Sequence, residues 1–264
     1  MTHVLAADSV ATAHRRRVAS RTRFFAVMSG VTLLIVLSGF APTLFLRPLF
    51  KPAPIPWYLY LHGALLTSWF AMLFVQTVLI QSGRTAVHRR LGVAGAVLAI
   101  AIPFAGLMAT FGAVPRVLAS GLTLDSDASA LGIGVSGPLE AFLSGVVWVN
   151  LSAALTFALL VGTAIVLRRK TAAHKRLMVV GTVAILGPAL ARLARLPIFG
   201  GEQGPFTPVA LLVLLAAVFF HDVISLRRIH PATLVGIIFA IAINQASGVI
   251  ASSEAGLTLV RWLQ

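Results

Sequence analysis

Three histidines stand beside basic residues, each between one apolar stretch and the next: His88, His174 and His230. Imidazole nitrogens are common ligands of zinc and copper, so three converging side chains of this kind would suit such a metal. The alternative is structural. A residue at the start of a helix can cap it, and the neighbouring arginines can anchor the turn to anionic lipid.

A fourth histidine, His221, is followed directly by Asp222 near the end of an apolar stretch. It lies roughly 7–8 Å deeper than the following turn at 1.5 Å per residue. An ionisable pair inside a membrane is costly and points to function: a metal ion, a proton relay or a quinone head. The alternative is that both residues reach water or pair with Arg227 or Arg228. The predicted metal ligands are His221, Asp222, His88 and His174.

A second polar set lies toward the middle and outer half of the apolar stretches. His62, Trp69 and Gln76 follow one another at steps of seven, so they share one face of a helix. The alternative for this stripe is hydrogen bonding between helices, and for Arg192 with Arg195 it is snorkelling to the interface. The predicted ligand-binding residues are His62, Trp69, Gln76, Asn150, Arg192 and Asn244.

Haem binding through two histidines requires both at the same depth on facing helices. His62 is expected in the outer half and His221 in the inner half, so they cannot share one iron. A single axial histidine with another ligand stays open, as do a metal ion and a quinone. The chain has no phosphate-binding glycine loop, no nucleophile elbow and no His-Glu-x-x-His motif.

The composition shows which elements must position these residues. Of the 264 residues, 58% are hydrophobic and 11% charged, against about 25% charged in soluble domains. Such a chain cannot cover a globule with polar groups and must face a lipid bilayer. The net charge of +14 falls in short runs between apolar stretches, which argues against nucleic acid. With no cysteine, disulfides and thiolate chemistry are excluded.

An all-α membrane protein with seven transmembrane helices is therefore predicted, each about 20 residues long. The expected spans are residues 24–46, 57–81, 91–112, 141–167, 177–197, 207–226 and 232–251. Residues 1–23 form a basic cytoplasmic segment, 24–252 the membrane domain, and 253–264 an outer tail. From Leu257 to Gln264 this tail is expected to form a short interfacial helix.

The basic residues predict the orientation. With the N-terminus inside and the C-terminus outside, fifteen of the 21 Lys and Arg residues lie on the inner side. Five of the seven acidic residues then lie outside. Short inner loops rich in Lys and Arg are typical of multi-pass proteins. The apolar run after Arg23 is too long for a signal-peptide core and is expected to be retained.

The basic turns also indicate repeated helical hairpins. Residues 84–100 and 170–186 align without a gap at an offset of 86, and a third, weaker copy surrounds His230. Internal duplication is common in transport folds. The alternative is that any inner loop tends to be basic.

The segment from His62 to Gly92 resembles a stretch found in uncharacterised bacterial multi-pass membrane proteins. Its matching residues are His62, Trp69, Gln76, His88, Arg89, Leu91 and Gly92. The resemblance covers about thirty residues and implies a bacterial inner (plasma) membrane, but no activity.

These sequence features are compatible with three functions. The first is binding or transport of a small ligand in a polar cavity between the second, fourth, fifth and seventh helices. The second is a redox subunit that holds haem, a metal or a quinone, and the third is a non-catalytic assembly or scaffold protein. Whether the chain is an enzyme, and its oligomeric state, stay open.

Overall fold

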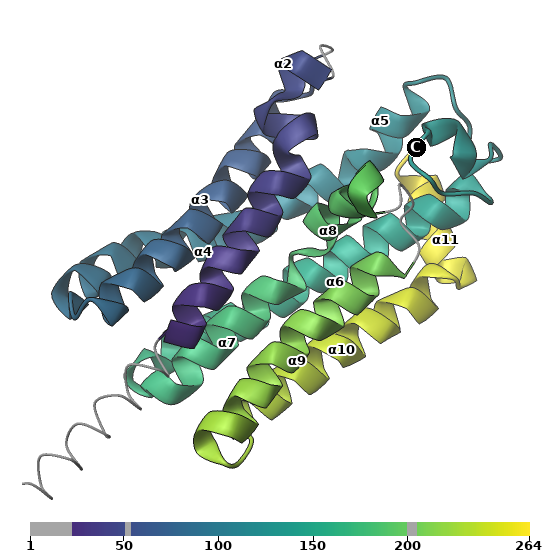
Figure 1. Ribbon diagram of the computed structural model, residues 1–264. Coiled ribbons are helices and arrows are strands. Elements are labelled where there is room, and N and C mark those ends of the chain that lie inside the picture. The colour runs from purple at the N-terminus through teal and green to yellow at the C-terminus, as the bar shows by residue number, and fades with distance from the viewer. Residues whose placement is uncertain (1–22, 51–53, 200–204) are drawn as a thin grey trace, which may run out of the picture.

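The computed structural model describes residues 23–50, 54–199 and 205–264, and nearly all of them are helical (Figure 1). Within these ranges there is no β-strand, only an isolated bridge between Asp127 and Pro138. Helices suit an apolar chain because each satisfies its backbone hydrogen bonds within its own segment, with no need for water.

Six helices of the described chain are long and apolar enough to cross a membrane. They are Arg23–Phe45, α3 (Trp57–Gln81), α4 (Thr85–Phe111), α6 (Leu139–Val166), α9 (Phe206–Leu226) and α10 (Pro231–Ala251). The protein is therefore a multi-pass membrane protein by length and composition. Most predicted bounds agree within two residues, but α4 starts six residues earlier than predicted, at Thr85.

The predicted span 177–197 is not one straight helix. It is a pair, α7 (Thr171–Ala184) and α8 (Gly187–Ala194), bent by 48°. Pro188 stands in the first turn of α8. Proline has no backbone N–H to donate to the preceding turn, and its ring clashes with the carbonyl four residues back, so α7 cannot run on through it. The pair gives a seventh crossing if both halves form one span.

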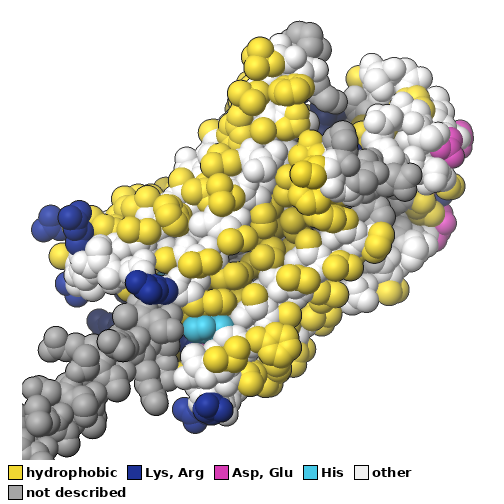
Figure 2. Space-filling view, in the orientation of Figure 1, with side chains coloured by type: hydrophobic (Ala, Val, Ile, Leu, Met, Phe, Trp, Pro, Cys, Tyr) yellow, Lys and Arg dark blue, Asp and Glu magenta, His cyan; other side chains and the backbone are white. Residues whose placement is uncertain are grey.

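Short elements gather at one end of the bundle (Figure 1). These are η1 (Ala41–Phe45), α2 (Arg47–Phe50), α5 (Ala113–Leu118), η2 (Ala128–Leu131), η4 (Pro197–Phe199) and α11 (Glu254–Trp262). The opposite end holds the turns between long helices, including η3 (Leu167–Arg169). On the face drawn in Figure 2, most of the visible Lys and Arg side chains lie at the turn end, and the visible Asp and Glu side chains lie at the other end.

The helix predicted in the C-terminal tail is confirmed as α11. Ser253 caps it by accepting a hydrogen bond from the Gly256 N–H at 3.3 Å. Arg261 holds α11 against α6 through Glu140 and also pairs with Glu254, both at 2.5 Å. These pairs are exposed to solvent, so each adds about 0–1 kcal/mol at most.

The core lies where the first span, α3, α6, α7, α8 and α9 meet. Its centre contains the fully buried side chains of Phe70, Phe157 and Val180. At Gly39 the first span approaches α8 so closely that an added Cβ would lie 2.4 Å from the Ala189 carbonyl oxygen. The glycine is therefore required by the packing of the two helices.

We expect Gly39→Ala to lower the stability of the protein by about 1–3 kcal/mol, because the clash is with backbone rather than a flexible side chain. Thermal unfolding in detergent measures this. Gly162→Ala, four residues before the end of α6, is the control, since nothing lies within 4 Å of a Cβ there. Equal midpoints for the two variants would contradict the close contact.

Candidate functional site

A buried ion pair joins α7 to α9 near the end of the bundle that holds the turns between long helices. Asp222 is fully buried, and Arg176 is almost so. The Arg176 Nε donates to both carboxylate oxygens at 3.0 Å, and its Nη2 also contacts Oδ1. The Thr233 hydroxyl donates to Oδ2 at 2.5 Å, and the His230 backbone N–H donates to it at 3.2 Å.

This network crosslinks three helices and leaves neither charge without a partner. Removing a single member of such a pair leaves an uncompensated charge in a medium that solvates it poorly. Arg176 was not predicted as a partner of Asp222. Arg227 and Arg228, the predicted alternative, are exposed beyond the end of α9. Arg176 lies five residues after the start of α7 at Thr171, and Asp222 lies four residues before the end of α9 at Leu226. The two residues are therefore at a similar distance from the turns, so their pairing could have been inferred from depth.

His221 contacts a different partner from that of Asp222. Its ring stacks on Phe24 of the first span, with centroids 3.9 Å apart and planes at 5°. His174 lies near enough to His88 for its charge to act on that imidazole, but no hydrogen bond or ring contact joins the two within the described residues. His174 Nδ1 lies 2.8 Å from the Ala164 carbonyl oxygen, to which it donates.

No three His, Asp or Glu side chains of the described ranges meet in a way that could hold a metal ion. The predicted ligands His221, Asp222, His88 and His174 are thus not gathered into one centre. His88 and His174 do not cap their helices either, because each lies three residues inside its helix.

His230 is the histidine that caps a helix. Its Nδ1 accepts the Ala232 N–H at 3.1 Å at the start of α10. Burial lowers the pKa of His230, and the nearby positive charge of Arg176 lowers it further. Both effects keep the imidazole neutral, which is the form that can accept this bond.

A lowered pKa in the folded state means that acid favours the unfolded chain. Between the ordinary pKa near 6.5 and the lowered folded pKa, only the unfolded His230 takes up a proton, so stability falls as pH falls through that window. His230→Asn keeps a capping oxygen but cannot titrate. We therefore expect the stability of this variant to decrease less steeply as the pH falls. Thermal midpoints from pH 7.5 to 5 measure it, and identical slopes for both proteins would contradict the assignment.

Toward the end of the bundle that holds the short elements lies a second polar site, with His62 on α3 and Arg192 on α8. The two side chains interact electrostatically. Arg192 lies over the Phe40 ring, 4.4 Å from its centroid, and its Nη1 donates to the Pro188 carbonyl at 2.8 Å. The Arg192 Nε and His62 Nδ1 atoms are buried, and neither has a hydrogen-bond partner among the residues that the structure describes.

Two further arginines add positive charge to this site, which we call the outer cationic site (His62, Arg192, Arg116 and Arg195). Arg116 and Arg195 both act electrostatically on Arg192. Arg116 also donates to the Tyr58 hydroxyl at 3.2 Å. Across the described ranges, no carboxylate lies within 4 Å of any of these arginines. Glu202 lies outside the described residues.

The rest of the predicted stripe on α3 does not line a cavity with His62. Trp69 is buried in the core, where its Nε1 donates to the Thr182 hydroxyl at 3.1 Å and its ring meets Phe157 edge-on at 5.0 Å. It therefore separates His62 from Gln76. The Gln76 amide lies near Gly92 of α4 at the inner end, with its oxygen buried and unpartnered.

Two predicted residues lie away from the outer cationic site. Asn150 is half-buried on α6. Asn244 is exposed, which corrects its predicted position in an interior cavity. The buried face of α10 is formed instead by Thr233, Gly236, Ala240 and Ser247. Asn244 lies four residues after Ala240 and three before Ser247, so it is aligned with this face, yet its side chain is exposed.

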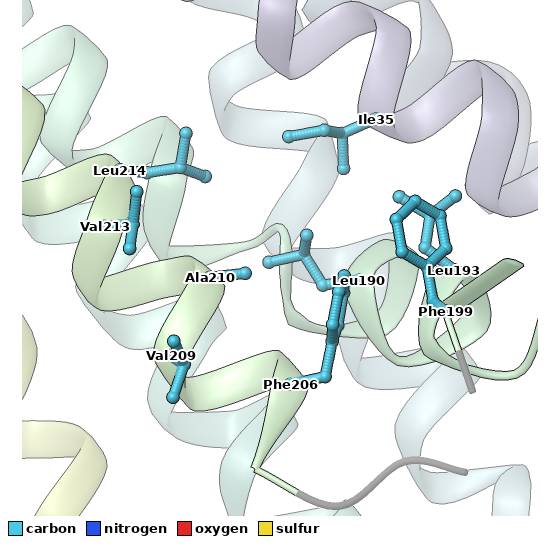
Figure 3. Close-up of a pocket in the computed structure, with 9 residues that line it drawn as sticks. All are labelled: Ile35, Leu190, Leu193, Phe199, Phe206, Val209, Ala210, Val213 and Leu214. Carbon is cyan, nitrogen blue, oxygen red and sulfur yellow. The ribbon is translucent and has the colours of Figure 1, made fainter. Parts of the chain in front are cut away.

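A cleft of about 410 Å³ opens between the first span, α8 and α9 (Figure 3). Its lining is apolar and includes Ile35, Leu190, Leu193, Phe206 and Ala210. None of the predicted ligand-binding residues lines it. A cleft without hydrogen-bonding groups can accept hydrocarbon but cannot orient a polar ligand.

No protein-family model matches this chain, and neither the curated proteins nor the solved structures contain a match. The resemblance of the segment from His62 to Gly92 to bacterial multi-pass proteins therefore stays a prediction. The geometry of the site alone must support a function.

Proposed function

We propose that this protein binds a small anionic ligand, such as a carboxylate or phosphate, at the outer cationic site. The observation that carries the proposal is the pair of buried, unpartnered nitrogens, Arg192 Nε and His62 Nδ1, in a region of positive charge. Burying an arginine without a carboxylate is costly, and such a cost is commonly retained where a ligand supplies the missing charge.

The two residues would have distinct roles. Arg192 provides the fixed charge and a charge-assisted hydrogen bond from Nε, the strongest kind available to an anion. Its guanidinium is held by Phe40 and the Pro188 carbonyl, so the donor is already oriented. His62 presents an imidazole nitrogen beside it, able to donate a second bond when that nitrogen carries the proton.

The proposal extends to the location of the protein. We place it in a bacterial inner membrane with the N-terminus inside and the C-terminus outside, in seven crossings. The separation of basic and acidic side chains between the two ends supports this orientation (Figure 2). It puts Arg192 in the outer half of the membrane. Reporter fusions at Asp125 and after Gln264 should both report the outer side.

Thermal unfolding of the detergent-purified protein tests ligand binding. Sodium benzoate and sodium phosphate serve as probes, and choline chloride at equal ionic strength is the control. A probe present at about 100 times its Kd stabilises by roughly 2.7 kcal/mol, or about 5–10 °C for a chain of this size. We expect one of the anions to raise the midpoint and choline to leave it unchanged.

The variant His62→Phe removes the second donor and should reduce the shift. Glu202→Gln tests whether the Glu202 carboxylate is itself the partner of Arg192. If it were, removing it would free the site and increase the shift in thermal midpoint caused by added anions. Equal midpoints with both anions and with choline, in the original protein and in Glu202→Gln, would refute the proposal. Uptake of the same probes into reconstituted vesicles then decides between binding and transport.

A further inference from the structure

One face of α10 has no partner within the described part of the chain. Leu234, Ile238, Ile241, Gln245 and Gly248 are all exposed along it. They follow one another at steps of four, three, four and three residues. This is the heptad spacing of two helices that cross at a shallow angle, with one seam turned toward a partner. We call these five residues the α10 seam.

Gln245 is the polar residue of the seam, and its position would place a polar side chain against the hydrocarbon of the lipid. Gln245 lies about 20 Å from the inner end of α10 and about 9 Å from its outer end, at 1.5 Å per residue. Its side chain is too short to reach the interface from there. The amide forms no hydrogen bond to any described residue, so in a lone chain it would face hydrocarbon, where unmet polar groups are costly.

Gly248, the glycine of the seam, is not required by packing against any described residue of the same chain. A Cβ added at Gly248 would meet nothing within 4 Å. By contrast, an added Cβ at Gly236, on the buried face of the same helix, would touch Leu177 and Val180. Exposed small residues on membrane helices allow a second backbone to approach closely. Gly248 lies one turn from Gln245, where such an approach would bring the two amides together.

We propose that the α10 seam is the interface of a symmetric dimer of this protein. Copies of one protein insert in the same orientation, so their α10 helices are parallel. A two-fold axis along the membrane normal then places each seam residue opposite its own copy. Glutamine is its own complement in this arrangement, because its amide carries both donors and an acceptor. A single polar residue in a heptad seam also fixes register and partner number.

Crosslinking tests the interface directly, since the chain contains no cysteine to confuse it. Ile241→Cys, in the seam, should crosslink to itself in vesicles over a series of lipid dilutions. Val97→Cys is the matched control: it is 62% exposed on α4 at a similar depth, but outside the seam. Crosslinking that is equal at the two positions would overturn the proposal.

Single-molecule photobleaching of the full-length protein in vesicles gives the dimer affinity. Gln245→Leu keeps the size and removes the amide, so the dissociation constant should rise about tenfold, the order expected for an interhelical amide bond. Gly248→Leu should abolish the dimer without changing the thermal midpoint, because its side chain points into open space. Asn244→Leu, beside the seam, should have little effect. A monomeric original protein, or dimers unaffected by both seam variants, would overturn the proposal.

Discussion

The variant Asp222→Asn is expected to lose about 3–5 kcal/mol of stability, because it leaves the Arg176 charge buried without its counter-charge. For a chain of this length, that corresponds to a fall of about 6–20 °C in the thermal midpoint. The loss should appear over a broad pH range, since arginine stays charged throughout. Thermal unfolding in detergent measures it.

The control is Asp125→Asn, which removes an exposed carboxylate from the connection between α5 and η2 and should change the midpoint little. The double variant Arg176→Met with Asp222→Leu replaces both charges by apolar groups and should recover most of the loss. A midpoint for Asp222→Asn close to that of the original protein would show that the pair does not hold α7 against α9.

A second substitution is expected to raise the thermal midpoint instead of lowering it. Arg192→Met is expected to raise the thermal midpoint in the absence of ligand by a few degrees, because it removes a buried cation for which the described residues provide no carboxylate. The same variant should lose the stabilisation by benzoate or phosphate. A hydrogen bond to a charged group contributes about 1.5–3 kcal/mol, so affinity should fall about 10- to 150-fold.

Arg89→Met serves as the control, since Arg89 is exposed at the inner end and should affect neither property. A variant that is less stable and still binds the probes would mean that Arg192 has a purely structural role. The pairing of higher stability with lost binding is what distinguishes a functional residue from one that supports the fold.

The long helices could be predicted from the sequence because hydropathy alone determines them. Residues 57–81 were predicted as a span, and α3 has the same bounds. The break between α7 and α8 at Pro188 is not among the predictions from the sequence. Whether a proline bends a helix or ends it depends on the surrounding contacts, here the close approach of Gly39.

The sites were predictable only in part, for a similar reason. The similar depth of His62 and Arg192 is predictable from the sequence, and in the structure the charge of Arg192 acts on His62. Asn244 was read as interior by depth alone, but the direction in which a side chain points depends on which helices pack nearby. The partner of Asp222 is not predictable from hydropathy, because the predicted span 177–197 places Arg176 in a turn, whereas α7 begins six residues earlier, at Thr171.

Isothermal titration of the protein in lipid nanodiscs tests the central claim, anion binding at the outer cationic site, most directly. Benzoate and phosphate are titrated into the original protein and into Arg192→Met under identical conditions. The account predicts saturable binding of at least one probe, with about one site per chain, and its loss in the variant. Equal heats for the two proteins, or no saturable binding by the original protein, would contradict it.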